Sequence, residues 1–156
     1  MSTVDVTPYR KTGALNGRCL CGEVTVSVDG GYIAAVGACH CIMCQRSNGV
    51  VFAAFEVDAD AVSATGPVTT YASSDFAERT FCGTCGSALW LRDTADRYGS
   101  GYEMAPGLFA GAADFPLISE IYCDRAPAYA ALAGEHPRKT RADYEQNNLH
   151  IQGDMT

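Results

Sequence analysis

The sequence contains no apolar run close to the ~18 residues that a membrane-spanning helix requires. Its first residues lack the basic residues and the apolar stretch of a secretory signal peptide. Basic residues are scarce, because 11 lysines and arginines stand against 18 aspartates and glutamates and the formal net charge is −7. Such an acidic protein is poorly suited to bind a nucleic-acid backbone or an anionic membrane surface. We therefore expect a cytoplasmic protein without a nucleic-acid or membrane partner.

The composition predicts one folded domain. Apolar residues make up 47% of the 156 residues and charged residues 19%, which is too apolar a balance for a disordered chain. A chain of this length can bury an ordinary core without disulfides. We expect a flexible polar segment at 1–12, a domain at 13–136 and a polar tail at 137–156.

Short strand-like segments dominate the domain, so the expected class is mainly β. From Gly13 onward, apolar or alternating segments are separated by glycine, proline and aspartate. The run 49–57 is almost continuously apolar, as in a strand buried on both faces. A short helical turn is expected near 126–133. The other expected strands are 23–28, 68–72, 78–82, 88–92 and 117–123.

Cysteine is the most informative residue type, since eight cysteines occur in a chain that needs no disulfide. Seven of them form three groups: C-x-C at Cys19 and Cys21, C-x-C-x-x-C at Cys39, Cys41 and Cys44, and C-x-x-C at Cys82 and Cys85. A tight turn can direct two thiolates at one metal ion. A redox C-x-x-C is instead typical of a helix N-terminus, whereas the last pair lies between two expected strands. The spacing therefore favours metal binding over redox or disulfide chemistry.

The seven grouped cysteines suffice for one closed site and one site with three cysteines. Structural zinc is usually held by four protein ligands, and catalytic zinc by three with an open position. Cys39, Cys41 and Cys44 can surround one ion from a single turn. The pairs 19/21 and 82/85 can then hold a second ion between them.

Four other residues are candidates for the fourth ligand of the three-cysteine site. Cys123 stands alone and is more typical of a buried, unreactive thiol. In an extended segment His40 points away from its neighbouring cysteines, which favours a structural or supporting histidine over a ligand. His136 and His150 lie near or in the polar tail, where we expect them to be exposed.

An open position on a three-thiolate ion suits a soft ligand. Three thiolates on Zn²⁺ leave a net charge of about −1 and a weak Lewis acid, so hydrolysis by a metal hydroxide is disfavoured. A substrate thiol can bind there as thiolate and attack a small electrophile such as an aldehyde. A nucleobase deaminase is disfavoured because its H-x-E and P-C-x-x-C signature is missing. Zinc is favoured over iron because no single run contains four cysteines.

Three segments together resemble the glutathione-dependent formaldehyde-activating enzyme family, which includes the centromere protein V domain. They are GRCLCGEV at 17–24, CHCIMCQR at 39–46 and FCGTCGSAL at 81–89. The resemblance implies a β-tent fold of packed antiparallel sheets with two zinc ions per chain. It implies a structural zinc at the two cysteine pairs and a catalytic zinc at Cys39, Cys41 and Cys44. The implied activity is that of a carbon–sulfur lyase, which joins formaldehyde to glutathione to give S-(hydroxymethyl)glutathione.

Under this hypothesis several neighbouring residues have expected roles. Arg46 could meet a carboxylate of glutathione, or form an ordinary surface ion pair. Gln45 and Ser47 could donate hydrogen bonds near the metal or satisfy the turn. Gly22 and Gly86 follow the paired cysteines and are expected to adopt a positive φ.

The acidic charge of the chain disfavours an anionic tripeptide, so two alternatives to the glutathione reaction remain. One is a zinc-stabilised interaction module without catalysis, in which the second ion is closed by His40, Cys123 or a partner. The other is an enzyme that acts on another small thiol or carbonyl compound.

Overall fold

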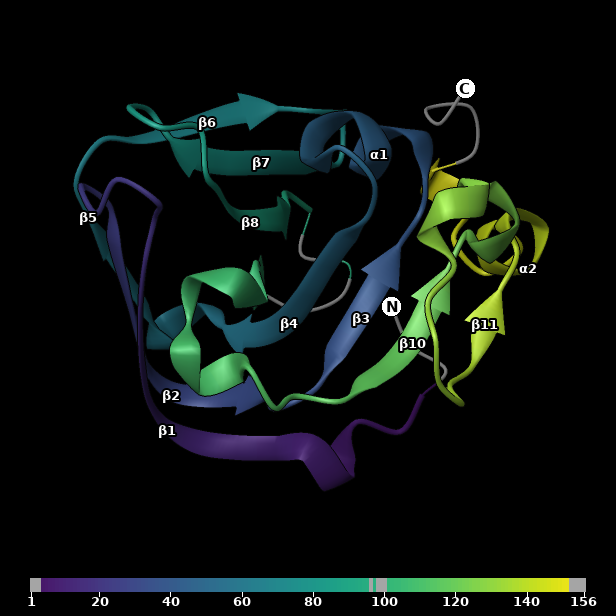
Figure 1. Cartoon of the computed structure of the whole chain (residues 1–156), viewed down its shortest axis with the longest axis horizontal. Coiled ribbons are helices and arrows are strands. Elements are labelled where there is room, and N and C mark those ends of the chain that lie inside the picture. Colours follow the sequence, from purple (N-terminus) through teal and green to yellow (C-terminus); the bar gives the residue numbers. More distant parts are fainter. Residues whose placement is uncertain (1–3, 96, 98–100, 152–156) are drawn as a thin grey trace.

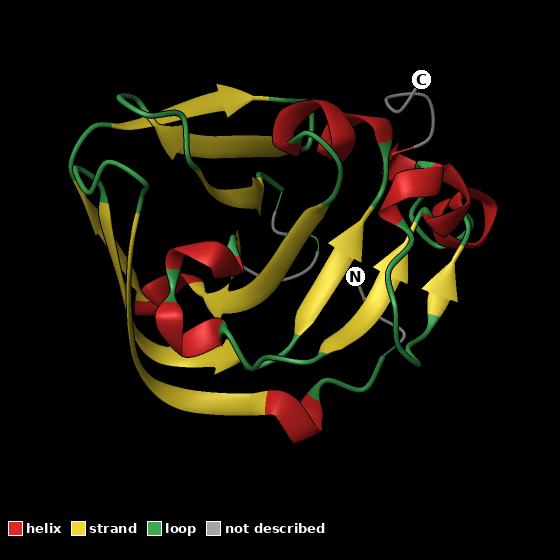
Figure 2. Ribbon diagram, in the orientation of Figure 1, coloured by secondary structure: helices red, strands yellow, loops and turns green. Residues whose placement is uncertain are grey.

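The computed structural model describes residues 4–95, 97 and 101–151 of the chain, and the described part is mainly β (Figures 1 and 2). Its strands are β1 (Arg10–Arg18), β2 (Thr25–Ile33), β3 (Val36–Cys39), β4 (Phe52–Asp58), β5 (Val62–Thr65), β6 (Val68–Ala72), β7 (Ala77–Cys82), β8 (Ala88–Asp93), β9 (Gly101–Met104), β10 (Leu117–Ile121) and β11 (Arg138–Lys139). Its α-helices are α1 (Ile42–Asn48) and α2 (Arg141–Glu145). Single 3₁₀ turns are η1 (Thr7–Tyr9), η2 (Ala59–Ala61), η3 (Pro106–Leu108), η4 (Ala110–Ala112), η5 (Cys123–Arg125), η6 (Ala128–Ala130) and η7 (Leu149–Ile151). Among the described residues, no helix has the length and apolar character to cross a membrane.

One sheet contains all these strands in the order β11-β10-β3-β4-β9-β8-β7-β6, and β1, β2 and β5 branch from it beside β4. Most neighbours are antiparallel, as expected for the class. The exceptions involve β10, which runs parallel to both β3 and β11. The prediction of a mainly β chain is thus confirmed, with a mixed rather than a purely antiparallel sheet. The sheet curves strongly, so that β6 and β7 lie opposite β1 and β2 in Figure 1.

Strand β4 shows how alternation along the chain creates two different faces. Phe55 and Val57 are 1% exposed and belong to the main hydrophobic core, together with valines of β2 and Phe109. The even-numbered residues Phe52, Ala54 and Glu56 face the opposite side and line a cavity, because successive side chains of a strand point to alternate faces. The apolar run at 49–57 is therefore a central strand with one core face and one cavity face.

The expected strands match the observed ones best in the middle of the chain. The expected strand 68–72 coincides with β6, and 78–82 and 88–92 correspond to β7 and β8. Strands β1, β3 and β9 and helix α1 were not expected, since their sequences are polar, short or rich in glycine and cysteine. These elements become regular only through pairing and turn contacts with distant segments.

The two ends of the described chain carry regular structure. Strand β1 begins at Arg10 and pairs over nine residues with β2. In the polar tail, α2 begins with a capping box between Thr140 and Asp143. The Tyr144 and Ile151 side chains are buried in a second hydrophobic cluster, together with Phe52 and Ile121. The domain boundaries at 13 and 136 stay predictions.

Candidate metal centres and the adjoining cavity

The first cysteine cluster joins two loops that are far apart in the sequence. Cys19 and Cys21 follow β1, while Cys82 and Cys85 lie at the turn between β7 and β8. Their four sulfurs all lie within 4.8 Å of one another. The Sγ–Sγ distance is 3.5 Å from Cys19 to Cys21 and 3.8 Å from Cys21 to Cys82. Four sulfurs held about 2.3 Å from one ion would lie about 3.8 Å apart, so the cluster fits a tetrahedral thiolate site.

A glycine closes each of these two loops. Gly22 and Gly86 have φ values of 83° and 74°, which confirms the predicted left-handed conformation. Their N–H groups donate to the carbonyl oxygens of Cys19 and Cys82, at 3.1 and 2.8 Å. Other backbone N–H groups donate to the sulfurs. The Val24 N–H, for example, donates to the Cys19 sulfur at 3.3 Å. The turns therefore direct both the thiols and their hydrogen-bond donors toward one point.

The two loops are also joined through Ser87. Its hydroxyl oxygen accepts from Leu20 N–H at 3.0 Å and lies 3.2 Å from the Cys85 sulfur. The hydrogen bond with Ser87 lowers the pKa of the Cys85 thiol to about 5. This thiol is therefore ready to act as a metal ligand in its deprotonated form.

The second cluster consists of Cys39, Cys41 and Cys44, whose sulfurs also lie within 4.8 Å of one another. Cys39 ends β3, Cys41 is the N-cap residue of α1, and Cys44 lies in the first turn of that helix. The Cys41 sulfur accepts the Cys44 N–H at 3.4 Å. Hydrogen bonds from Cys39 and Cys44 lower the pKa of Cys41, whereas hydrogen bonds with Cys41 and Cys44 raise the pKa of Cys39. Three thiols in one turn fit one soft metal ion and, among the described residues, have no fourth His, Cys, Asp or Glu ligand beside them.

A cavity of about 640 Å³ adjoins the three cysteines. Its walls include all three cysteines and the alternate residues of β4, β7, β8 and β9 that face away from the core. Register places four of these residues in one row across the sheet, since Arg79 pairs with Leu91, Leu91 with Glu103, and Glu103 with Glu56. The row runs from a cation near the cysteines to a pair of carboxylates.

Arg79 is the residue of this row that contacts the cluster. Its Nη2 donates to the Cys44 sulfur at 3.4 Å. Its guanidinium carbon lies 5.6 Å from the centre of the Phe52 ring. The cysteine pattern gives no signal for this residue, because its approach depends on strand register.

Glu103 and Glu56 lie opposite each other on β9 and β4, and in the described part of the chain neither has a hydrogen-bonding or ion-pair partner. Burial and the neighbouring charge of Glu56 raise the pKa of Glu103 to about 7. Like charges on directly opposed residues repel, and sharing a proton relieves that repulsion. The cavity thus contains a carboxyl group that titrates near neutral pH.

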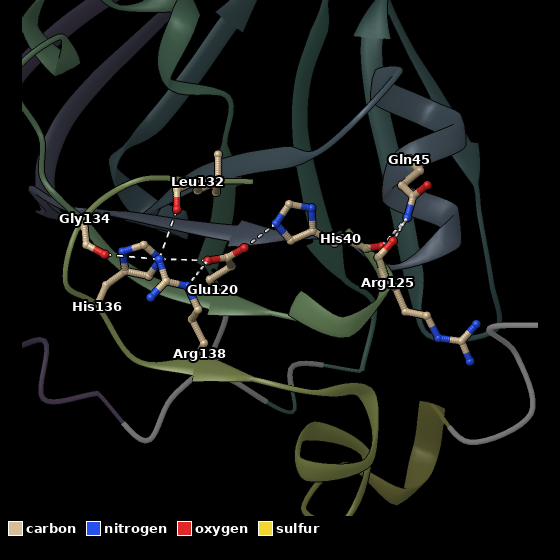
Figure 3. Close-up of polar contacts among 8 residues, drawn as sticks. All are labelled: His40, Gln45, Glu120, Arg125, Leu132, Gly134, His136 and Arg138. Carbon is tan, nitrogen blue, oxygen red and sulfur yellow. Dashed lines mark hydrogen bonds and ion pairs between the residues drawn. The ribbon is translucent and has the colours of Figure 1, made fainter. Parts of the chain in front are cut away.

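Behind the second cluster, His40 belongs to a buried polar network (Figure 3). Its Nε2 bonds to Glu120 on β10 at 2.7 Å, and the same carboxylate accepts from His136 Nε2 (2.8 Å) and Arg138 Nε (2.9 Å). Although burial opposes ionisation, the hydrogen bonds from His136 and His40 lower the pKa of Glu120. Gln45 Nε2 donates to the His40 carbonyl at 2.7 Å, which holds α1 against this segment.

The network decides the outcome of two histidine predictions. His40 supports the loop and is not part of the cysteine cluster, in line with the expected supporting role. The expectation that His136 is exposed is wrong, because its side chain is 2% exposed and bound to Glu120. Glu120 lies on a strand parallel to β3, a pairing that only the tertiary structure creates.

A profile of the glutathione-dependent formaldehyde-activating enzyme family matches residues 14–125. The chain belongs to this family. The matched segment contains both cysteine clusters and most of the cavity wall, including Arg79, Glu103 and Glu56.

Two relatives of the chain agree with this membership. An uncharacterized lyase of Schizosaccharomyces pombe is 32% identical over 93 residues, which span 59% of this chain and 66% of the relative, just under two thirds of its length. A crystal structure of a Rhodobacter sphaeroides protein has a TM-score of 0.51 with 22% identity, and the match covers 65% of this chain and 98% of that one. The second likeness supports the fold alone.

The structure also places the other residues that the sequence analysis considered for the three-cysteine site. Arg46 is exposed on α1 and is not among the described residues that line the cavity. Gln45 and Ser47 donate to backbone carbonyls, so they satisfy the turn. Cys123 is partly buried and lies outside both clusters. His150 lies at the cavity wall beside Phe76 rather than fully in solvent.

Tyr122 is a cavity residue that the sequence pattern does not reveal. It is 1% exposed, lines the cavity, and its hydroxyl donates to Glu145 at 3.2 Å. Its φ of 56° is left-handed, and among the described residues other than glycine no other has a positive φ. Such strained positions often occur where a site requires a particular backbone path.

Proposed function

We propose that this chain is a zinc-dependent enzyme of the carbon–sulfur lyase type, which adds a small thiol to a small aldehyde such as formaldehyde. With glutathione as the thiol, the product would be S-(hydroxymethyl)glutathione. The observation that carries the proposal is that the three-cysteine cluster forms part of the wall of a 640 Å³ cavity. A ligand in that cavity could therefore reach an ion held by Cys39, Cys41 and Cys44.

The two clusters would have different roles. Cys19, Cys21, Cys82 and Cys85 would give one ion four sulfur ligands, the number typical of structural zinc. The three-cysteine set would hold the catalytic ion. When bound there, zinc supplies a Lewis acid that holds a thiol as thiolate and polarises a carbonyl oxygen.

The residues of the cavity supply the remaining requirements of the reaction. Addition forms a bond between sulfur and the carbonyl carbon, while a proton passes from the thiol to the carbonyl oxygen. Glu103 has a raised pKa but lies at the far end of the row from the cysteines, so it could exchange this proton only indirectly. Phe52, Leu91 and Ile121 give the cavity apolar walls that limit water.

The carboxylates of the cavity favour a further candidate among the alternatives, which is a small thiol other than glutathione. Glu56 and Glu103 would repel the two carboxylates of glutathione wherever these approach the far end of the row. A neutral or cationic thiol would meet no such repulsion. An interaction module without chemistry is less well supported, because His40 is bound to Glu120 and Cys123 lies outside the cluster.

The first experiment measures metal content and then thiol binding. The protein as isolated should contain two zinc ions per chain, and cobalt substitution should give thiolate-to-metal absorption. Addition of glutathione or a smaller thiol such as cysteamine should change that spectrum, and NMR should show faster hydroxymethyl thioether formation from formaldehyde than in buffer.

Cys123→Ser is the matched control, since this cysteine lies outside both clusters. It should retain two metals and the same spectral response. A cobalt spectrum that responds to no thiol would contradict the proposed enzyme and favour a closed site.

A further inference from the structure

Arg79 differs from the other arginines of this chain in what it contacts. Five arginines form ion pairs with carboxylates, and the three others, Arg18, Arg46 and Arg125, are exposed to solvent. The paired five are Arg10, Arg92, Arg97, Arg138 and Arg141. In the described part of the chain, Arg79 has no carboxylate within ion-pair distance, and it donates instead to the Cys44 sulfur at 3.4 Å. Its Nε is buried and has no hydrogen-bond partner among the residues that the structure describes. An unpaired guanidinium at the wall of a cavity is costly to keep unless an anion compensates it.

A metal ion held by the three cysteines would give Arg79 such an anion. A Zn²⁺ ion with three thiolates carries a net charge of about −1, and a fourth thiolate would make this net charge about −2. A doubly negative centre in a partly enclosed cavity is unfavourable without a nearby cation. Arg79 Nη2 already contacts one of the three sulfurs, so its charge lies beside any ligand that enters the fourth position.

Other charged groups of the cavity do not replace Arg79 in this function. Arg10 is paired with Asp58. Glu103 lies two strands away from Arg79 in the row, a backbone separation of about 10 Å at the usual strand spacing. The positive charge of Arg79 is therefore directed at the cysteines, while the far end of the row is negative.

We propose that Arg79 is a specificity-determining residue that allows an anionic fourth ligand, a thiolate, to bind the three-cysteine metal centre. This role rests on the proposed function. It predicts a selective effect: removal of the positive charge weakens binding of a ligand that enters as an anion and leaves binding of a neutral ligand almost unchanged. Loss of packing alone would weaken both ligands equally.

The test compares two small ligands on the cobalt-substituted full chain. 2-Mercaptoethanol binds as a thiolate and has no other charge, whereas imidazole binds as a neutral nitrogen donor. Both are titrated by visible absorption at one pH against wild type, Arg79→Gln, Arg79→Lys and Arg125→Gln. Arg125 is an exposed arginine that does not line the cavity, so its variant is the matched control.

The expected result is a selective loss of thiol binding. Arg79→Gln should raise the Kd of 2-mercaptoethanol by at least about 10-fold and change that of imidazole by less than about 2-fold. Arg79→Lys keeps the charge and should fall between wild type and Arg79→Gln. Arg125→Gln should match wild type. Metal content should stay at two ions in all four proteins.

The other outcomes would overturn either the role of Arg79 alone or the proposed function as well. If Arg79→Gln binds 2-mercaptoethanol as wild type does, or loses both ligands equally, the role of Arg79 is overturned while the proposed function stands. If the wild-type spectrum responds to no thiol, the proposed function fails and the role of Arg79 fails with it. Should Arg79→Gln not fold, Arg79→Lys decides, because a loss of imidazole binding equal to the loss of thiol binding would overturn the role.

Discussion

Replacement of Glu103 by glutamine should change how the stability of the protein depends on pH. Glu103 is partly buried, faces the cavity and lies opposite Glu56. Burial and the Glu56 charge raise its pKa from 4.5 to about 7. Because this pKa is higher in the folded than in the unfolded chain, the folded protein binds more protons between these two pH values. The free energy of unfolding should therefore decrease as pH rises from about 4.5 to about 7.

The size of the effect follows from the pKa difference. Each pKa unit corresponds to about 1.4 kcal/mol, so a rise from 4.5 to about 7 corresponds to about 3 kcal/mol. Below pH 5 the neutral carboxyl and the glutamine amide are similar in size, and the two proteins should have similar stability. Near pH 8 the Glu103→Gln protein should be the more stable by up to about 3 kcal/mol.

Urea unfolding of the zinc-loaded proteins at pH values from 5 to 8 would measure this difference. Other groups that titrate in this range are common to both proteins, so the difference between the two curves isolates Glu103. Glu135→Gln is the matched control, since Glu135 is exposed in a loop. Glu56→Gln should reduce the pH dependence, because it removes the repelling charge. Parallel curves for wild type and Glu103→Gln would refute the reasoning.

Three further substitutions test the cysteine clusters and the buried network. Cys82→Ser should abolish cooperative thermal unfolding, since structural zinc contributes folding free energy. Cys44→Ser should instead keep the fold and contain one metal ion. A soluble, cooperatively melting Cys82→Ser protein with two ions would contradict the first expectation. Glu120→Ala should lower the free energy of unfolding in urea by about 3–5 kcal/mol, because it leaves His40, His136 and Arg138 without their shared acceptor. A loss below about 1 kcal/mol would count against the importance of that network.

The cysteine clusters could be predicted from the sequence because their geometry is mostly local. Closely spaced cysteines in a tight turn must direct their sulfurs to one side, whatever the rest of the fold does. The same holds for the positive φ of Gly22 and Gly86, and for the alternation that separates His40 from its neighbouring cysteines. Ligand counting then assigns the cysteine pairs to one cluster, and the structure brings these pairs together.

The surroundings of the clusters could not be predicted in this way. The expected exposure of His136 is wrong because Glu120, its partner, reaches it only through the β10–β11 pairing. Strand β1 and helix α1 have weak patterns of their own and depend on contacts with β2 and with the cysteine loop. Propensity and periodicity report on neighbours along the chain and carry no information on such distant partners.

The family, the mainly β class and the two cysteine clusters that could hold metal ions follow from the sequence, since the strand patterns and each group of cysteines lie within a few positions along the chain. The side chains that surround the three-cysteine cluster depend instead on the tertiary structure. Arg79 meets Cys44, and Glu103 meets Glu56, through strand register and the curvature of the sheet. Register is set by long-range pairing, and a shift of one residue would turn each of these side chains to the opposite face.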